Sequence, residues 1–236
     1  MENKVKKSKN GLKIVLVIIG GILLAFAFFI SQDLKQEKIL RETIDNYIAN
    51  QVLPSEATTT GEYYKIEKNI LEYLQNTNKY TEELTKVFYD IYDYEFYSVD
   101  NVSKSINDDF KSDKEKLAKY EDELNTKLNQ FIELNNYDEL LKKLNTEDSY
   151  YKDLYVELLG NKDGFNEANA KYEEFKTLYK EYFKVANKYI DFLEDSTVKV
   201  DEKENLIMFI KDSEIAEYDK ISTELNEYLA NIVARQ

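Results

Sequence analysis

The sequence contains no cysteine and no histidine, only one proline, and six glycines among its 236 residues. Without cysteine there is no disulfide, no thiolate nucleophile and no thiolate metal ligand. Without histidine the chain lacks the commonest proton shuttle and the commonest metal ligand. These absences exclude cysteine enzymes, serine–histidine hydrolases and metal sites that require histidine. We therefore predict no catalytic residue, no cofactor and no metal site, and we expect a protein that is not an enzyme.

Charge is distributed unevenly along the chain. The 32 basic and 46 acidic residues give a net charge of −14, but residues 1–13 hold five lysines and one acid, so the rest carries −18. Residues 14–30 (IVLVIIGGILLAFAFFI) have no charge and no hydrogen-bonding side chain. A helix of that length is about 25 Å long, close to the ~30 Å hydrocarbon thickness of a bilayer. We predict that residues 14–30 cross the membrane once.

Two interpretations of this apolar segment stay open. A basic start, an apolar stretch and the small-residue pattern Ala25-Phe26-Ala27 also describe a cleavable secretory signal, in which case the protein is secreted. We favour the uncleaved anchor, because the apolar run continues past that pattern to Ile30. The lysines of residues 1–13 favour a cytoplasmic N-terminus and an extracytoplasmic remainder, although the charge difference between the two sides is moderate.

After the anchor, apolar residues recur at helical spacing almost throughout. Breaks in that spacing coincide with Pro54, Gly61, Gly160 and Gly164, and no segment shows the alternation of a strand. We therefore divide the chain into a basic cytoplasmic tail (1–13), a transmembrane signal-anchor helix (14–30), a membrane-proximal helix and turn (31–61) and an extracytoplasmic helical bundle (62–236).

Two apolar stripes alternate spacings of three and four residues. The first comprises Tyr63, Ile66, Ile70, Tyr73, Thr77, Tyr80, Leu84, Val87, Ile91 and Tyr94. The second comprises Phe165, Ala168, Tyr172, Phe175, Tyr179, Tyr182, Ala186, Tyr189 and Leu193. Such spacing is typical of coiled-coil-like packing. The predicted fold is all-α: an N-terminal transmembrane helix followed by an elongated antiparallel helical bundle with coiled-coil-like packing.

Two further expectations concern the ends of helices. Polar residues at 98–103 (SVDNVS) predict a turn between two long helices. The last helix is expected to begin near Asp201, with Leu206, Ile207 and Ile210 facing inward. Because its apolar period slips between Lys211 and Tyr218, we expect a kink or a change of packing partner there.

The most unusual segment is residues 88–97 (FYDIYDYEFY), with six aromatic and three acidic residues. On a helix, the four residues Tyr89, Asp90, Asp93 and Tyr97 gather on the side away from the first stripe. Aromatic faces beside carboxylates can bind a cationic ligand, a basic peptide or a partner protein. The alternative is that these tyrosines pack their rings in the core while their hydroxyls reach polar edges.

The sequence supports three hypotheses for function. The first is a scaffold or adaptor that docks another envelope protein or a second copy of itself, and the second is a sensing module for a cationic ligand. The third and least favoured is a carboxylate-dependent hydrolase, because no pair of acids stands out. The negative charge opposes binding of nucleic acid. An excess of 30 lysines over two arginines and an exported domain without cysteine suggest a bacterial envelope protein.

Overall fold

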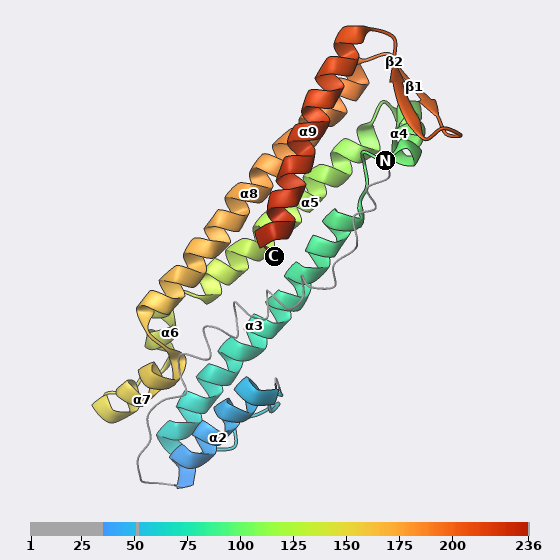
Figure 1. Ribbon diagram of the computed structural model, residues 1–236. Helices are drawn as coiled ribbons and strands as arrows, with labels where there is room; N and C mark the ends of the chain where they lie inside the picture. The colour runs from blue at the N-terminus through green and yellow to red at the C-terminus, as the bar shows by residue number, and fades with distance from the viewer. Residues whose placement is uncertain (1–34, 51, 236) are drawn as a thin grey trace. The chain divides into compact units, whose positions relative to one another are not determined.

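A computed structural model describes residues 35–50 and 52–235 (Figure 1). Its elements are α2 (Lys35–Asn50), α3 (Gly61–Asp93), α4 (Val99–Ser105), the 3₁₀ turn η1 (Ile106–Asp108), α5 (Lys111–Leu134), α6 (Tyr137–Lys143), α7 (Ser149–Leu159), α8 (Lys162–Asp195), β1 (Val198–Asp201), β2 (Leu206–Phe209) and α9 (Asp212–Arg235). The predicted helical class is confirmed, because helices make up most of the described chain.

The predicted tail and anchor, residues 1–30, lie outside the described residues. Among the helices that the structure does describe, none combines the length and the apolar composition needed to cross a membrane.

The described chain forms two compact units. Residues 35–50, 52–83 and 129–172 belong to the first, and residues 84–128 and 173–235 belong to the second. The long helices α3, α5 and α8 each contribute residues to both units.

The core of the first unit draws on most of its helices. Leu40 and Tyr47 from α2, Ile66 from α3, Tyr155 from α7 and Phe165 from α8 are each no more than 2% exposed and belong to one apolar cluster. A shared core of this kind holds the short helices against the start of α3, because each of them buries its apolar side there.

A buried carboxylate fixes the loop that leads into α3. Glu67 is 1% exposed, and it accepts hydrogen bonds from the backbone N–H groups of Thr58 and Thr59 at 2.8 and 2.7 Å. The two threonine hydroxyls donate to the same carboxylate at 3.2 and 2.6 Å. Four donors compensate the loss of water around the buried charge, so Glu67 serves the fold and is not available to a ligand.

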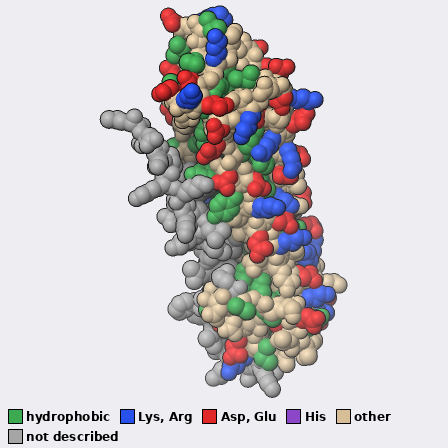
Figure 2. Space-filling view, turned by 90° about the vertical axis from the view of Figure 1, so that its right-hand side faces the viewer, with side chains coloured by type: hydrophobic (Ala, Val, Ile, Leu, Met, Phe, Trp, Pro, Cys, Tyr) green, Lys and Arg blue, Asp and Glu red, His purple; other side chains and the backbone are tan. Residues whose placement is uncertain are grey.

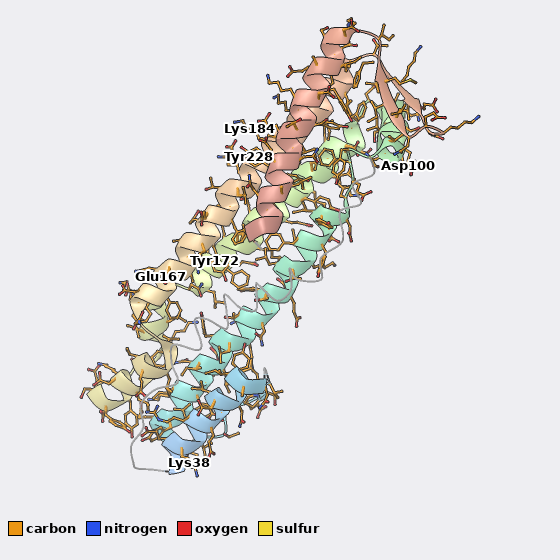
Figure 3. All side chains as sticks on the ribbon, viewed as in Figure 1. Lys38, Asp100, Glu167, Tyr172, Lys184 and Tyr228 are labelled. Atoms are coloured by element: carbon orange, nitrogen blue, oxygen red, sulfur yellow. The ribbon has the colours of Figure 1, made fainter. Side chains whose placement is uncertain are left out.

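Both predicted stripes are confirmed as buried sides of helices. In the first stripe Tyr80 and Tyr94 are half-buried and the other members are buried. In the second, only Tyr172 and Phe175 are half-buried. The ring of Tyr172, which is labelled in Figure 3, stacks on that of Phe131 of α5 with centroids 4.9 Å apart. The spacing of apolar residues therefore identified the core faces of α3 and α8 correctly.

The turn predicted at residues 98–103 is wrong. Ser98 is the N-cap of α4, because its Oγ accepts a hydrogen bond from the backbone N–H of Asn101 at 3.2 Å. Turn residues precede α4 at 96–97, and two residues with positive φ angles, Asp109 at 52° and Phe110 at 57°, follow it just before α5. Serine and asparagine favour turns and helix N-caps alike, which is why composition alone misplaced this turn.

A β-hairpin replaces the predicted start of the last helix. Strands β1 and β2 pair antiparallel, with Val198 opposite Phe209 and Asp201 opposite Leu206. Asp201 does not cap a helix: its carboxylate accepts hydrogen bonds from the N–H groups of Lys203 and Glu204 in the hairpin turn at 3.0 and 3.2 Å. Helix α9 starts only at residue 212. The slip in apolar period is therefore not a kink but the change from strand to helix.

Because several tyrosines are buried, we expect the protein to unfold at alkaline pH. Burial raises the pKa of the core tyrosines Tyr73, Tyr155, Tyr182 and Tyr189 and that of the half-buried Tyr172. In the unfolded chain a tyrosine ionises near pH 10. Below that pH, tyrosine ionisation therefore does not change the free energy of unfolding. Above it, stability falls by roughly 1.4 kcal/mol per pH unit for each tyrosine that ionises only on unfolding.

An alkaline titration checks this expectation. Ultraviolet absorbance follows tyrosine ionisation while circular dichroism follows helix content, and we expect the buried group to ionise together with the loss of helix. Ionisation of all 20 tyrosines near pH 10 with the helix signal unchanged contradicts the described core.

Candidate functional site

The predicted acidic and aromatic patch is only partly assembled. Tyr89, with 51% of its surface exposed, and the exposed Asp90 and Asp93 lie on the last turns of α3. Tyr97 does not share that helical face, because α3 ends at Asp93 and Tyr97 lies in the following turn. There it is half-buried, with its ring centroid 5.3 Å from that of Phe96. The prediction that all four residues share one helix face is wrong.

A buried hydrogen-bond network lies beside that patch. Asp113 of α5 is 2% exposed and accepts hydrogen bonds from the side-chain amide of Asn101, with 3.0 Å to each carboxylate oxygen. The hydroxyl of Tyr94 donates to the same carboxylate. The amide of Asn101 also donates to the backbone carbonyl of Phe96 at 3.2 Å. One carboxylate thus connects α5, the turn after α3 and helix α4.

The cation beside these aromatic rings comes from the chain itself. The ammonium of Lys116 lies 3.6 Å from the ring centroid of Tyr94 and 5.8 Å from that of Tyr120. Burial, together with Asp113, raises the pKa of Tyr94, so its hydroxyl stays protonated and donates. Burial and the nearby charge of Asp90 raise the pKa of Tyr120. Cation–π contact therefore exists here, but as an internal contact that needs no ligand.

The outward face of the hairpin carries an exposed apolar row that we did not predict. Leu206, Met208 and Ile210, which we call the hairpin row, are 52%, 40% and 63% exposed. They alternate with Ile207 and Phe209, which are half-buried. Alternation of this kind places the row on one face of β2 and of the residue after it. The prediction that Leu206 and Ile210 lie on the inward side of a helix is therefore wrong.

The inward face of the hairpin is packed within the second unit. The ring centroid of Phe209 lies 5.5 Å from that of Phe192 in α8 and 5.0 Å from that of Tyr218 in α9. On the α4 side, the hydroxyl of Ser103 donates to Glu202 in the hairpin turn at 2.7 Å. These contacts support the hairpin from behind, and Figure 1 shows it beside α4.

Charged side chains border the hairpin row. In the register of the hairpin, Lys199 lies opposite Met208 and Asp201 lies opposite Leu206, so both charges project from the same outward face. In the upper part of Figure 2, which shows the second unit, hydrophobic side chains lie among acidic and basic ones. Exposed apolar surface rimmed by charge is typical of a protein interaction surface.

Sequence features could have identified this hairpin. Four polar residues at 202–205 (EKEN) separate the short runs VKVD and LIMF. Asparagine tolerates the positive φ of a tight turn, and Asn205 has a φ angle of 55°. We missed it because both runs are four residues long and also fit a helix.

Comparisons of the chain with protein-family models, with curated proteins and with solved structures find no match. Within the described residues, no group of three or more acidic side chains is arranged to hold a metal ion. The buried carboxylates of Glu67 and Asp113 are both occupied by protein donors. The hairpin row is therefore the described feature that most directly suggests a function.

Proposed function

We propose that the chain is a single-pass membrane protein of a bacterial cell envelope whose extracytoplasmic helices act as a scaffold or adaptor. In this proposal a partner protein docks on the hairpin row. The observation that carries it is the exposure of Leu206, Met208 and Ile210 on one face of a strand that is packed firmly from behind. Water contact with this apolar surface is unfavourable, and a partner that covers the row removes it.

Two parts of this proposal, the membrane anchor and the coiled-coil-like packing of the helices, are inferred from the sequence. Residues 14–30 are apolar and long enough to span a bilayer, and the lysines before them favour an extracytoplasmic location for residues 31–236. The three-and-four spacing of both buried stripes supports antiparallel, coiled-coil-like packing of the long helices. An anchored scaffold needs these two properties, a tether and a rigid helical body.

The charge of the chain suggests the chemistry of the partner. Residues 14–236 carry a net charge of −18, which attracts basic proteins and repels nucleic acid. We therefore expect a protein with an apolar contact surface set among lysine or arginine residues. Docking between two copies of this chain would use the same row but would work against charge repulsion.

Substitution of Met208 by glutamate tests this docking surface. A charge in the centre of an apolar contact leaves that carboxylate desolvated, so we expect crosslinked partner from intact cells to fall about tenfold or more. Met208 is 40% exposed, so the free energy of unfolding should change by no more than about 0.5 kcal/mol.

The matched control is Thr223→Glu, which adds the same charge at an exposed position of α9. It should leave both crosslinking and stability unchanged. If the wild type and Met208→Glu capture equal amounts of the partner, the hairpin row is not the docking surface.

A further inference from the structure

A pocket of about 320 Å³ lies between α6, the loop after it and α7, within the first unit. Its lining combines four apolar or aromatic side chains with four polar ones: Leu141, Leu144, Tyr155 and Val156, and Lys142, Asn145, Thr146 and Lys152. Pockets that bind small molecules occupy about 300–1,000 Å³ and are mostly apolar. This pocket is at the small end of that range, which suits a single short acyl chain.

The tyrosine in the pocket wall presents only its apolar ring. Tyr155 is 1% exposed, and its hydroxyl donates to the backbone carbonyl of Leu140 at 3.1 Å. Burial raises the pKa of Tyr155, so the hydroxyl stays neutral. Since its hydroxyl is already bonded, the ring offers a ligand apolar contact and no hydrogen bond.

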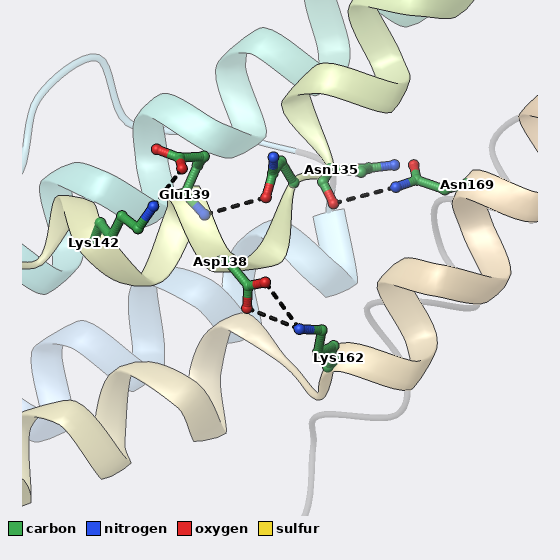
Figure 4. Close-up of polar contacts among 7 residues, drawn as sticks. Asn135, Asp138, Glu139, Lys142, Lys162 and Asn169 are labelled. Carbon is green, nitrogen blue, oxygen red and sulfur yellow. Dashed lines mark hydrogen bonds and ion pairs between the residues drawn. The ribbon is translucent and has the colours of Figure 1, made fainter.

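Two lysines line the pocket, and they differ in their partners. The ammonium of Lys142 lies 2.6 Å from the carboxylate of Glu139 on the same helix (Figure 4). Lys152 of α7 is exposed, and within the described residues its ammonium has neither an ion pair nor a hydrogen bond. A positive charge without a partner beside an apolar cavity complements a ligand with an apolar chain and a negative head group.

The wall that carries Lys152 is held in place without a ligand. Arg41 of α2 donates two hydrogen bonds to the carboxylate of Glu157 in α7, at 2.8 and 3.1 Å. The hydroxyl of Tyr150, also in α7, donates to Glu37 of α2. A wall fixed in this way lowers the cost of ordering the pocket when a ligand binds.

We propose that this pocket binds a single-chain anionic amphiphile. The acyl chain lies against Leu141, Leu144, Tyr155 and Val156, and the carboxylate or phosphate of the head group pairs with Lys152. This site is in the first unit, whereas the hairpin row is in the second, so it does not depend on the docking proposal.

Binding of straight-chain carboxylates to the full chain in nanodiscs of zwitterionic phosphatidylcholine, which has no net charge, tests the proposal. Empty nanodiscs correct for partition into lipid. From hexanoate to decanoate, each added methylene should tighten binding about fourfold, which corresponds to about 0.8 kcal/mol, until the pocket is full. Alcohols of the same length should bind more weakly, because they cannot pair with Lys152.

Single substitutions distinguish the contribution of the ligand's head group to binding from that of its acyl chain. Lys152→Gln should weaken octanoate binding about tenfold and leave octanol binding unchanged, whereas Lys143→Gln, an exposed lysine that does not line the pocket, should change neither. Val156→Glu should weaken both ligands. An affinity independent of chain length, no saturable binding, or an equal loss in Lys152→Gln and Lys143→Gln overturns the proposal.

The source of the ligand is decided by a competition arm. A lysophosphatidic acid and a fatty acid of the same chain length should each displace octanoate from the pocket. Tighter binding of the lysophosphatidic acid indicates a membrane lipid as the ligand, and tighter binding of the fatty acid indicates a free fatty acid. Competition by either supports the proposed head group, and competition by neither contradicts it.

Discussion

Replacement of Leu84 by aspartate is expected to unfold the second unit or to lower its free energy of unfolding by about 4–5 kcal/mol. Leu84 is 2% exposed and lies in the buried stripe of α3, between Thr77 and Ile91, which are buried as well. A carboxylate at this position loses its hydration and gains no hydrogen-bond donor or basic side chain in exchange. The protein must either protonate the group or open its core, and both outcomes cost stability.

Urea unfolding followed by circular dichroism measures this effect. Glu82→Asp is the control, because it places the same aspartate on the exposed side of α3, two residues away. We expect the control to lie within about 0.5 kcal/mol of the wild type. Similar midpoints for Leu84→Asp and the wild type would mean that this side of α3 is not buried.

Replacement of Asp113 by alanine is expected to lower the free energy of unfolding by about 1–3 kcal/mol. Its carboxylate accepts hydrogen bonds from the side-chain amide of Asn101 and the hydroxyl of Tyr94. Its loss leaves the half-buried Tyr94 hydroxyl without this acceptor, whereas the Asn101 amide keeps only the carbonyl of Phe96 and the hydroxyl of Ser105. The effect should exceed that of an ordinary surface change because Asp113 is 2% exposed. Asp113→Asn keeps one oxygen acceptor and should cost less.

Hydrogen exchange of residues 94–105 provides the second measurement for this variant. Because Asp113 connects the turn after α3 with α4, we expect faster exchange in that segment and smaller changes elsewhere in the second unit. Asp122→Ala removes an acid of the same helix whose side chain is not part of the network and serves as the control. An equal loss of stability in the two variants would contradict the structural role of the Asp113 network.

Burial along the long helices could be predicted from the sequence because it follows a regular spacing. Leu84 and Tyr189 were assigned to the core from their positions in the two stripes, and both are buried. The break predicted at Gly160 is confirmed, because Gly160 is the C-cap of α7 with a φ angle of 115°. The break predicted at Gly164 is wrong, because α8 begins at Lys162 and Gly164 lies in its first turn.

The hairpin escaped prediction for a physical reason. Its strands are short, and what stabilises them is the packing of Phe209 on Phe192 and Tyr218, residues from two other elements. Local propensity does not contain such contacts. The error also reversed the exposure of Leu206 and Ile210, since a strand and a helix place successive side chains on different faces.

The acidic and aromatic segment at residues 88–97 is unusual in composition, but its contacts could not be derived from the sequence. The end of α3 at Asp93 separates Tyr97 from Tyr89, and Lys116 of the next long helix reaches the ring of Tyr94. Both facts depend on tertiary structure. Binding of a cationic ligand at Tyr89, Asp90 and Asp93 stays a prediction.

Photo-crosslinking in intact cells tests the central claim, docking on the hairpin row, most directly. A photoreactive amino acid is introduced singly in place of Leu206, Ile207, Met208 and Ile210 of the full chain. We predict adducts with a partner protein at 206, 208 and 210 and little or none at 207, which faces inward. No adduct at any of these positions, or adducts of equal yield at all four, would contradict the proposed docking surface.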